Sequence, residues 1–241
     1  MPKQRYSQFW YGVGILLAAN VAVWYVLPKS VPHDFASVVF FDVGQGDSAY
    51  VRTAQGNDIL IDGGPDDSVL GKLGRVMPFL DRKIELVILT HPHADHISGL
   101  VEVLKRYEVG GIVAPDAPCD SASCKTFFDL AAQKNIPITR PMAGMRIFLD
   151  EETVFDVYYP ASANSAVAVK DLNDASLVGK LTFGAESVLF TGDAGADTEN
   201  FLSAAEFPLV SGILKIGHHG SATSSSRQFL DLVSPKDAVI S

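Results

Sequence analysis

Cysteine and positive charge are both scarce in this sequence. Two cysteines in 241 residues are too few for a disulfide scaffold or for a four-cysteine zinc ribbon. Lys and Arg number 19 against 28 Asp and Glu, so the formal net charge is -9. This balance argues against a protein that coats nucleic acid through a basic surface.

Internal repeats and low-complexity segments are also absent. The 13 prolines and 20 glycines follow no period, which excludes collagen and coiled coil. With 47% hydrophobic residues, the chain is too apolar to be disordered. Its length suits one large domain or two small ones.

A long run without charge lies near the N-terminus. Residues 9–27 are almost wholly apolar, with aromatic residues at both ends. At about 1.5 Å per residue, a helix of this length spans roughly the hydrocarbon core of a bilayer. Lys3 and Arg5 precede the run, so the positive-inside rule places the N-terminus in the cytoplasm.

The sequence therefore predicts a single-pass membrane anchor over residues 1–31 and an extracytoplasmic domain over residues 32–241, located at the cell membrane. A cleaved signal peptide and a buried core helix remain as alternatives for the apolar run.

The remainder predicts an α/β domain. Residues 36–43, 48–53 and 58–62 form closely spaced strands, and residues 84–90 form an apolar strand that is buried on both faces. Later strands alternate with helices, expected over 97–107, 126–134, 196–205 and 225–233. This order fits two sheets with helices on their outer faces.

Five of the six histidines lie in two short clusters, and the first cluster carries the strongest motif. The sequence THPHADH follows the apolar strand directly. His91 and His93, two residues apart, can converge on one metal ion, and Asp95 and His96 can point at a second. Imidazole and carboxylate ligands suit zinc, manganese or iron.

Two further motifs also follow apolar strands. Asp193, in LFTGDAG, is a carboxylate that can bridge two metal ions. His218 and His219 lie in LKIGHHGS, where one histidine is expected to be a ligand and the other structural.

These three motifs, in this order, resemble the metallo-β-lactamase fold. The sequence around these motifs is similar to the hydrolase domain of the ComEC-type DNA-internalisation competence proteins and to a bacterial phosphorylcholine esterase of teichoic acids. The matching segments are 41–51, 60–64, 89–100, 173–178, 189–194 and 213–226. The resemblance implies a four-layer αββα sandwich that holds two divalent metal ions, zinc or manganese.

The resemblance also implies a role for each motif residue. His91 and His93 would bind the first ion, Asp95 and His96 the second, and Asp193 would bridge the two. Asp95 and Asp193 would be the catalytic carboxylates. A water shared by two such ions ionises near neutral pH and can attack phosphorus or a carbonyl carbon.

The second histidine cluster leaves a choice of ligand. His219 would complete the second site, with His218 as the alternative. Many members of the superfamily place another histidine before the bridging aspartate, but here none lies between His96 and His218. Asn173 is favoured to fill that place, with Asp174 as the alternative.

Further polar residues near the motifs admit two interpretations each. Asp42, Asp47 and Asp62 are acceptors for ligand N–H groups or simply turn-capping residues. Ser221 and Thr223 hold a phosphate or cap a helix. Cys119 and Cys124 are expected to form a disulfide if the domain lies outside the cytoplasm.

The predicted function is a membrane-anchored dinuclear-metal phosphodiesterase or nuclease linked to DNA uptake. Its substrate would be single-stranded DNA or a cell-wall polymer. This sequence does not include the multi-helix channel of the competence proteins, and the domain is expected to be either C-terminally shortened or a fragment. A DNA pore would therefore need a separate channel protein. Alternatives are a hydrolase of carboxylic esters, lactones or β-lactams, and a non-catalytic binding or assembly module.

Overall fold

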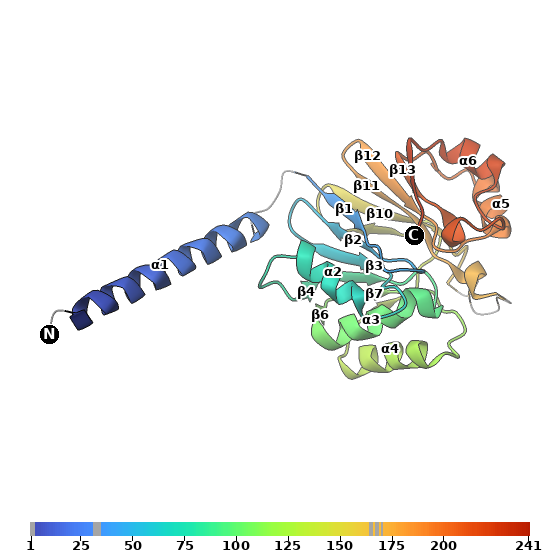
Figure 1. Cartoon of the computed structure of the whole chain (residues 1–241). Coiled ribbons are helices and arrows are strands. Elements are labelled where there is room, and N and C mark those ends of the chain that lie inside the picture. Colours follow the sequence, from blue (N-terminus) through green and yellow to red (C-terminus); the bar gives the residue numbers. More distant parts are fainter. Residues whose placement is uncertain (1–2, 31–34, 164–165, 167–168, 170) are drawn as a thin grey trace.

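The computed structural model describes residues 3–30, 35–163, 166, 169 and 171–241. The N-terminal helix α1 (Lys3–Ser30) lies apart from a globular body (Figure 1), in which the described residues form two six-stranded sheets, one two-stranded sheet and five α-helices. The expected boundary between residues 31 and 32 lies outside the described residues.

The prediction of a membrane anchor was wrong. Among the described residues, no helix is long and apolar enough to cross a membrane. The predicted single-pass location, with the catalytic domain outside the cytoplasmic membrane, is therefore not supported.

The first sheet contains the opening antiparallel strands and the apolar strand before the histidine motif. Its strands, in spatial order, are β1 (Ser37–Phe40), β2 (Ala49–Arg52), β3 (Asp58–Ile61), β5 (Leu86–Ile88), β7 (Ile112–Val113) and β8 (Ile138–Thr139). The pairings from β1 to β3 are antiparallel, and those from β3 to β8 are parallel. Two short strands, β4 (Lys83–Ile84) and β6 (Glu108–Val109), pair separately.

The second sheet is also mixed. Its strands, in spatial order, are β14 (Asp237–Val239), β13 (Ile213–Lys215), β12 (Glu186–Phe190), β11 (Val178–Phe183), β10 (Thr153–Tyr159) and β9 (Arg146–Phe148). The hairpin between β11 and β12 turns at Gly184, whose φ of 58° favours glycine. Strands β12, β13 and β14 run parallel.

Helices cover the outer face of each sheet. Helices α2 (Ser68–Val76), α3 (Ala94–Arg106) and α4 (Ala122–Gln133) pack on the first sheet, and α5 (Ala196–Ala204) and α6 (Arg227–Val233) lie beside the second (Figure 1). Short 3₁₀ turns η1 (Leu172–Ala175) and η2 (Gly217–Gly220) complete the described elements.

Alternating side chains explain why the layers stack in this order. On β3, Leu60 faces the helix-side core, whereas Ile59 and Ile61 face the core between the sheets. On β12, Val188 faces the core between the sheets and Leu189 faces α5 and α6. Successive side chains of a strand point to opposite faces, so each sheet is buried on both faces. The αββα sandwich predicted from the sequence is confirmed.

The parallel strands bring the chemical motifs together. Strands β3 and β5 of one sheet and β12 and β13 of the other each end at a segment that carries an expected ligand or its partner. Because ligand sites in such sheets lie beyond the carboxyl ends of the strands, this edge of the sandwich is the place to look for chemistry.

Candidate metal centre

The first histidine motif spans a loop and the start of a helix. His91 follows β5, His93 is the N-cap of α3, and Asp95 and His96 lie in the first turn of that helix. The helix therefore begins at Ala94 rather than near residue 97. It approaches the loop after β3 so closely that a Cβ on Gly99 would lie 1.9 Å from the Gly63 carbonyl oxygen.

His91 and His93 face one another. His91 Nε2 lies 3.0 Å from His93 Nδ1, and the same His91 atom lies 3.9 Å from Asp193 Oδ2. His91 is completely buried, whereas His93 is half-buried. The structure thus brings the two predicted first-site histidines together with the predicted bridging carboxylate.

His96 is held from behind by Asp62. Its Nδ1 lies 2.9 Å from Asp62 Oδ2, and Asp62 also accepts hydrogen bonds from the Thr90 N–H and hydroxyl, at 2.8 and 2.7 Å. This arrangement directs His96 Nε2 toward Asp193 Oδ2, 3.4 Å away. Asp62 is the acceptor for a ligand N–H group that one reading of the sequence predicts.

Asp193 and His219 complete the group from the second sheet. Asp193 follows β12, and its N–H donates to the Ser176 hydroxyl at 3.1 Å. His219 Nε2 lies 3.3 Å from Asp95 Oδ2 and 3.5 Å from Asp193 Oδ2. Asp193 is therefore central to a group contributed by both sheets.

Four of these residues form a group that fits a metal ion. Asp95, His96, Asp193 and His219 each offer a ligand atom, and those atoms lie within 4.8 Å of one another. Three buried polar atoms here have no hydrogen-bond partner among the described residues: His96 Nε2, Asp193 Oδ1 and His219 Nε2. Buried polar atoms are normally satisfied, so unpaired imidazole and carboxylate atoms that converge fit a divalent cation.

The charges in the centre are strongly coupled. Burial, together with the charge of His96, holds the pKa of His91 well below its usual value, which favours the neutral imidazole that binds metals. Burial alone would raise the pKa of Asp193, but the close ring of His96, with Nε2 at 3.4 Å from Asp193 Oδ2, outweighs it and lowers that pKa. The ring of His219, with Nε2 at 3.3 Å from Asp95 Oδ2, lowers the pKa of Asp95.

His218 and Asn173 lie beside this group rather than in it. His218 Nδ1 lies 3.3 Å from Thr223 Oγ1, and the residue lines a pocket together with Asn173 and Asp193. Both adjacent histidines have left-handed backbone angles, with φ of 48° for His218 and 51° for His219, so the turn points them in different directions. Asn173 Oδ1 is buried and unpartnered among the described residues, facing the same pocket.

The other residues singled out in the sequence lie around the centre or away from it. Asp42 accepts a weak hydrogen bond from the Gly44 N–H at 3.4 Å, as a turn-capping residue does. Ser221 and Thr223 bond one another at 3.0 Å ahead of α6. Cys119 and Cys124 form a disulfide, the pairing that the sequence predicted only for a domain outside the cytoplasm.

Lys215 lies next to the centre but was not identified from the sequence. This lysine is 3% exposed, and its Nζ lies 2.7 Å from Asp47 Oδ2. An apolar strand that ends in a single lysine before the GHHG sequence is the one available signal.

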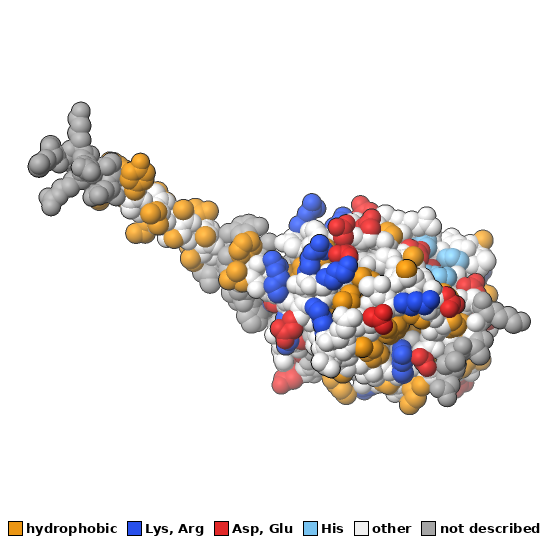
Figure 2. Space-filling view, turned by 90° about the horizontal axis from the view of Figure 1, so that it is seen from below, with side chains coloured by type: hydrophobic (Ala, Val, Ile, Leu, Met, Phe, Trp, Pro, Cys, Tyr) orange, Lys and Arg blue, Asp and Glu red, His pale blue; other side chains and the backbone are white. Residues whose placement is uncertain are grey.

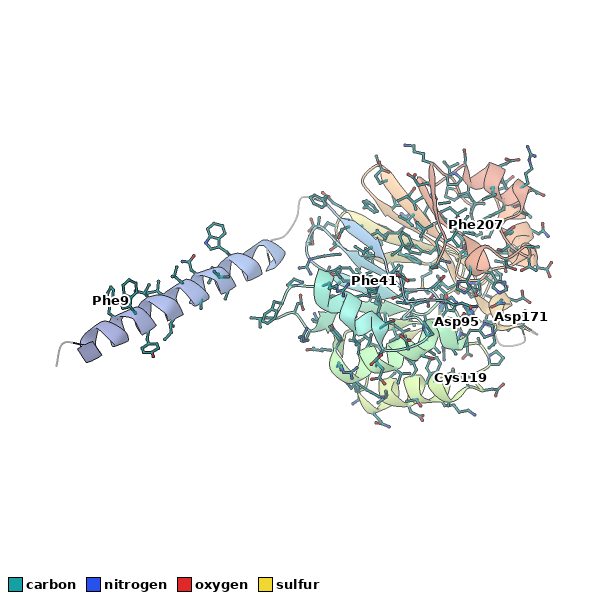
Figure 3. The ribbon with its side chains drawn as sticks, viewed as in Figure 1. Phe9, Phe41, Asp95, Cys119, Asp171 and Phe207 are labelled. Carbon is teal, nitrogen blue, oxygen red and sulfur yellow. A yellow bond between two sulfur atoms is a disulfide. The ribbon has the colours of Figure 1, made fainter. Side chains whose placement is uncertain are left out.

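The histidines gather at one place on the surface, at the end of the globular body far from α1 (Figure 2). Asp95 and Asp171 lie at this same end of the sandwich (Figure 3). The fold and this site together define a class of protein. Residues 41–241 match the metallo-beta-lactamase superfamily, and the chain belongs to it. Proteins with this fold are generally metal-dependent hydrolases.

Curated relatives include proteins named for competence. Competence protein ComA of Neisseria gonorrhoeae is 31% identical over 219 residues, which are 89% of this chain and 28% of that protein. ComE operon protein 3 of Bacillus subtilis (strain 168) is 28% identical, over 85% of this chain and 28% of that protein. The chain thus spans less than a third of the length of these relatives.

A more distant relative and a solved structure extend the comparison. Endoribonuclease YSH1 of Saccharomyces cerevisiae is 26% identical over 78% of this chain and 27% of that protein. Igni18, a metallo hydrolase of Ignicoccus hospitalis, superposes with a TM-score of 0.53 at 16% identity, covering 84% of this chain and 81% of that one. This structural likeness supports the fold alone.

Proposed function

We propose that this protein is a dinuclear metal-dependent hydrolase that cleaves phosphodiester bonds. The observation that carries the proposal is the convergence of unpartnered buried atoms from His96, Asp193 and His219 at one point. A metal-dependent hydrolase needs such a site, whereas a purely structural core would satisfy these atoms internally.

The residues divide into two halves that share Asp193. His91 and His93 would hold one divalent ion, zinc or manganese, and Asp95, His96 and His219 the other. His218 and Asn173 line the adjoining pocket, where they would serve as alternative metal ligands or contact the substrate. When bound, two such ions supply a water of lowered pKa and positive charge for the oxygens of the attacked group.

The chain's own groups orient this chemistry. Asp62 fixes the ring of His96, and Asp193 is nearly inaccessible, with its side chain 3% exposed. Asp95 has a side chain that is 31% exposed, so water and substrate reach it more readily. Asp95 is accordingly the carboxylate best placed to accept a proton from the attacking water.

The names of the relatives support a phosphodiester substrate. One relative is named an endoribonuclease, and an endoribonuclease breaks phosphodiester bonds. Two others are named for competence and for the ComE operon. Single-stranded DNA is therefore the first substrate to test, with a cell-wall phosphodiester as the second, and a separate channel protein is the proposed partner.

The test uses the full chain, loaded with zinc or manganese and offered single-stranded DNA, bis-p-nitrophenyl phosphate and nitrocefin. We expect both diesters to be cleaved, and His93→Ala and Asp193→Asn to abolish cleavage. Asp156→Asn is the control, because this carboxylate pairs with Arg146 on an outer strand, at 2.7 Å.

Two results would contradict the proposal. Nitrocefin turnover without diester cleavage would identify an enzyme for β-lactams or related acyl substrates. Absence of turnover by a protein with two bound ions would identify a binding or assembly module.

A further inference from the structure

Asp47 links the glycine-rich turn after β1 to the metal centre. Its N–H donates to the Asp95 carbonyl oxygen at 3.2 Å, and its own carbonyl accepts from the Gly64 N–H at 2.8 Å. Gly46, next to it, lies so near that a Cβ there would come within 2.3 Å of the Asp95 carbonyl oxygen. The main chain of this turn therefore fixes the first turn of α3 at Asp95.

The side chain of Asp47 reaches the opposite sheet. Oδ2 lies 2.7 Å from Lys215 Nζ at the end of β13, and Oδ1 lies 3.5 Å from His219 Nδ1. The Ser241 hydroxyl donates to Oδ1, and His219 Nδ1 lies 2.8 Å from the Ser241 carbonyl oxygen. Asp47 thus contacts the backbone of one ligand and the ring of another.

Lys215 is poorly explained by stability alone. Its side chain is 4% exposed and that of Asp47 8% exposed, and Nζ also donates to the Ile216 carbonyl oxygen at 2.8 Å. Removing both charges from water costs several kcal/mol per ion, and apolar residues often stabilise such a position as well or better. A buried ion pair that borders metal ligands points instead to a role in positioning them.

We propose that Asp47, anchored by Lys215, positions Asp95 and His219 and thereby sets the affinity of one of the two metal positions. The inference rests on the proposed dinuclear function. No described contact joins Asp47 to His91 or His93, which are oriented by Thr90 and by one another. Replacing Asp47 should therefore weaken metal binding only at the half of the centre that contains Asp95 and His219.

The test measures metal binding by the full chain, with zinc titrated against a competing chelator and bound zinc counted by elemental analysis. We expect wild type to bind two ions. Asp47→Asn should keep one near wild-type affinity and bind the other about 10- to 100-fold more weakly, as removal of a ligand's supporting partner typically does. Asp58→Asn is the matched control, because Asp58 is a buried carboxylate on β3 that pairs with Arg52 at 2.7 Å.

A double variant separates positioning from folding. Asp47→Asn leaves Lys215 as an unpaired buried charge, and Asp47→Asn with Lys215→Met removes that charge. The double variant should therefore melt at a higher temperature than Asp47→Asn while its second zinc ion stays weakly bound. Recovery of zinc affinity along with melting temperature would overturn the positioning role. If Asp47→Asn does not fold, Asp47→Glu is used instead: it keeps a negative charge near Lys215 but displaces the carboxylate, so the second zinc ion should again bind more weakly than in wild type.

Three other outcomes are decisive. Two zinc ions bound by Asp47→Asn with wild-type affinity would overturn the inference. An equal loss in Asp58→Asn would also overturn it, because the effect would then be general. Failure of wild type to cleave diesters, with the selective zinc loss intact, would refute the proposed activity and leave the positioning role standing.

Discussion

Asp62 lies directly behind His96, with Oδ2 at 2.9 Å from Nδ1, and the opposite ring nitrogen faces Asp193. The carboxylate accepts two more hydrogen bonds, both from Thr90. A buried acceptor that fixes one nitrogen of an imidazole leaves the other free to bind a metal ion.

Replacing this carboxylate should weaken metal binding. Asp62→Asn presents an amide that no longer accepts equally from His96 and Thr90, so we expect zinc affinity to fall about 10- to 100-fold. Isothermal titration with zinc measures the change, and Asp156→Asn is the exposed control. Unchanged affinity would show that His96 needs no orienting partner.

The stability of the fold should depend on the ionisation of Asp58. Burial raises the pKa of this carboxyl to about 6, although the hydrogen bonds from Tyr50 and Arg52 act in the opposite direction. The native state therefore binds a proton that the unfolded state releases near pH 4, and stability falls as pH rises from about 4 to about 6.

The effect is measured as the free energy of unfolding of wild type minus that of Asp58→Asn, across pH 4 to 7.5. A shift of about two pKa units corresponds to a decrease of up to about 3 kcal/mol in this difference. A difference that stays constant or rises with pH would contradict the assignment.

The pocket beside the centre should discriminate against long polyanions. Asp171, Asp174 and Asp197 line it with His218, and burial together with the charges of the other two carboxylates raises the pKa of Asp174. Each negative charge about 7 Å from a phosphate costs roughly 0.6 kcal/mol in water. Asp174→Asn and Asp197→Asn should each raise kcat/KM for single-stranded DNA about threefold at low salt.

The comparison uses Asp129→Asn as control, because this exposed aspartate lies on α4, on the outer face of the first sheet. High salt should abolish the gain, since exposed charges are screened. An equal gain in the control, or a gain that persists in high salt, would show that the carboxylates lining the pocket do not repel the substrate.

The disulfide should stabilise the start of α4. In the chain-entropy account, closing a loop as short as that between Cys119 and Cys124 contributes about 2 kcal/mol. Cys119→Ser should lower the free energy of unfolding by this amount under oxidising conditions and by much less when both proteins are reduced. Denaturant unfolding with and without reductant measures it, and an equal deficit in both conditions would indicate lost packing instead.

The grouping of the candidate ligands was predictable because the motifs that carry them follow apolar strands. An apolar run that ends in THPHADH has one buried direction and one polar end, so His91 and Asp95 had to reach the edge of a sheet. The choice between His218 and His219 was not predictable, because it depends on two left-handed residues in η2.

Other features needed the three-dimensional structure. Asp47 and Lys215 are 168 positions apart and lie in or next to different sheets. No local sequence pattern predicts their pairing. For the N-terminal helix, the sequence predicted a feature that the structure does not show. Hydropathy and aromatic ends favoured a membrane span, and the described residues contain none.

The most direct test of the central claim is a crystal structure of the full chain grown with zinc, with anomalous difference density recorded at the zinc edge. The dinuclear account predicts two peaks about 3.5 to 4 Å apart, one beside His91 and His93 and one beside Asp95, His96 and His219, with Asp193 between them. Zinc bound only elsewhere, or an empty centre at saturating zinc, would contradict it.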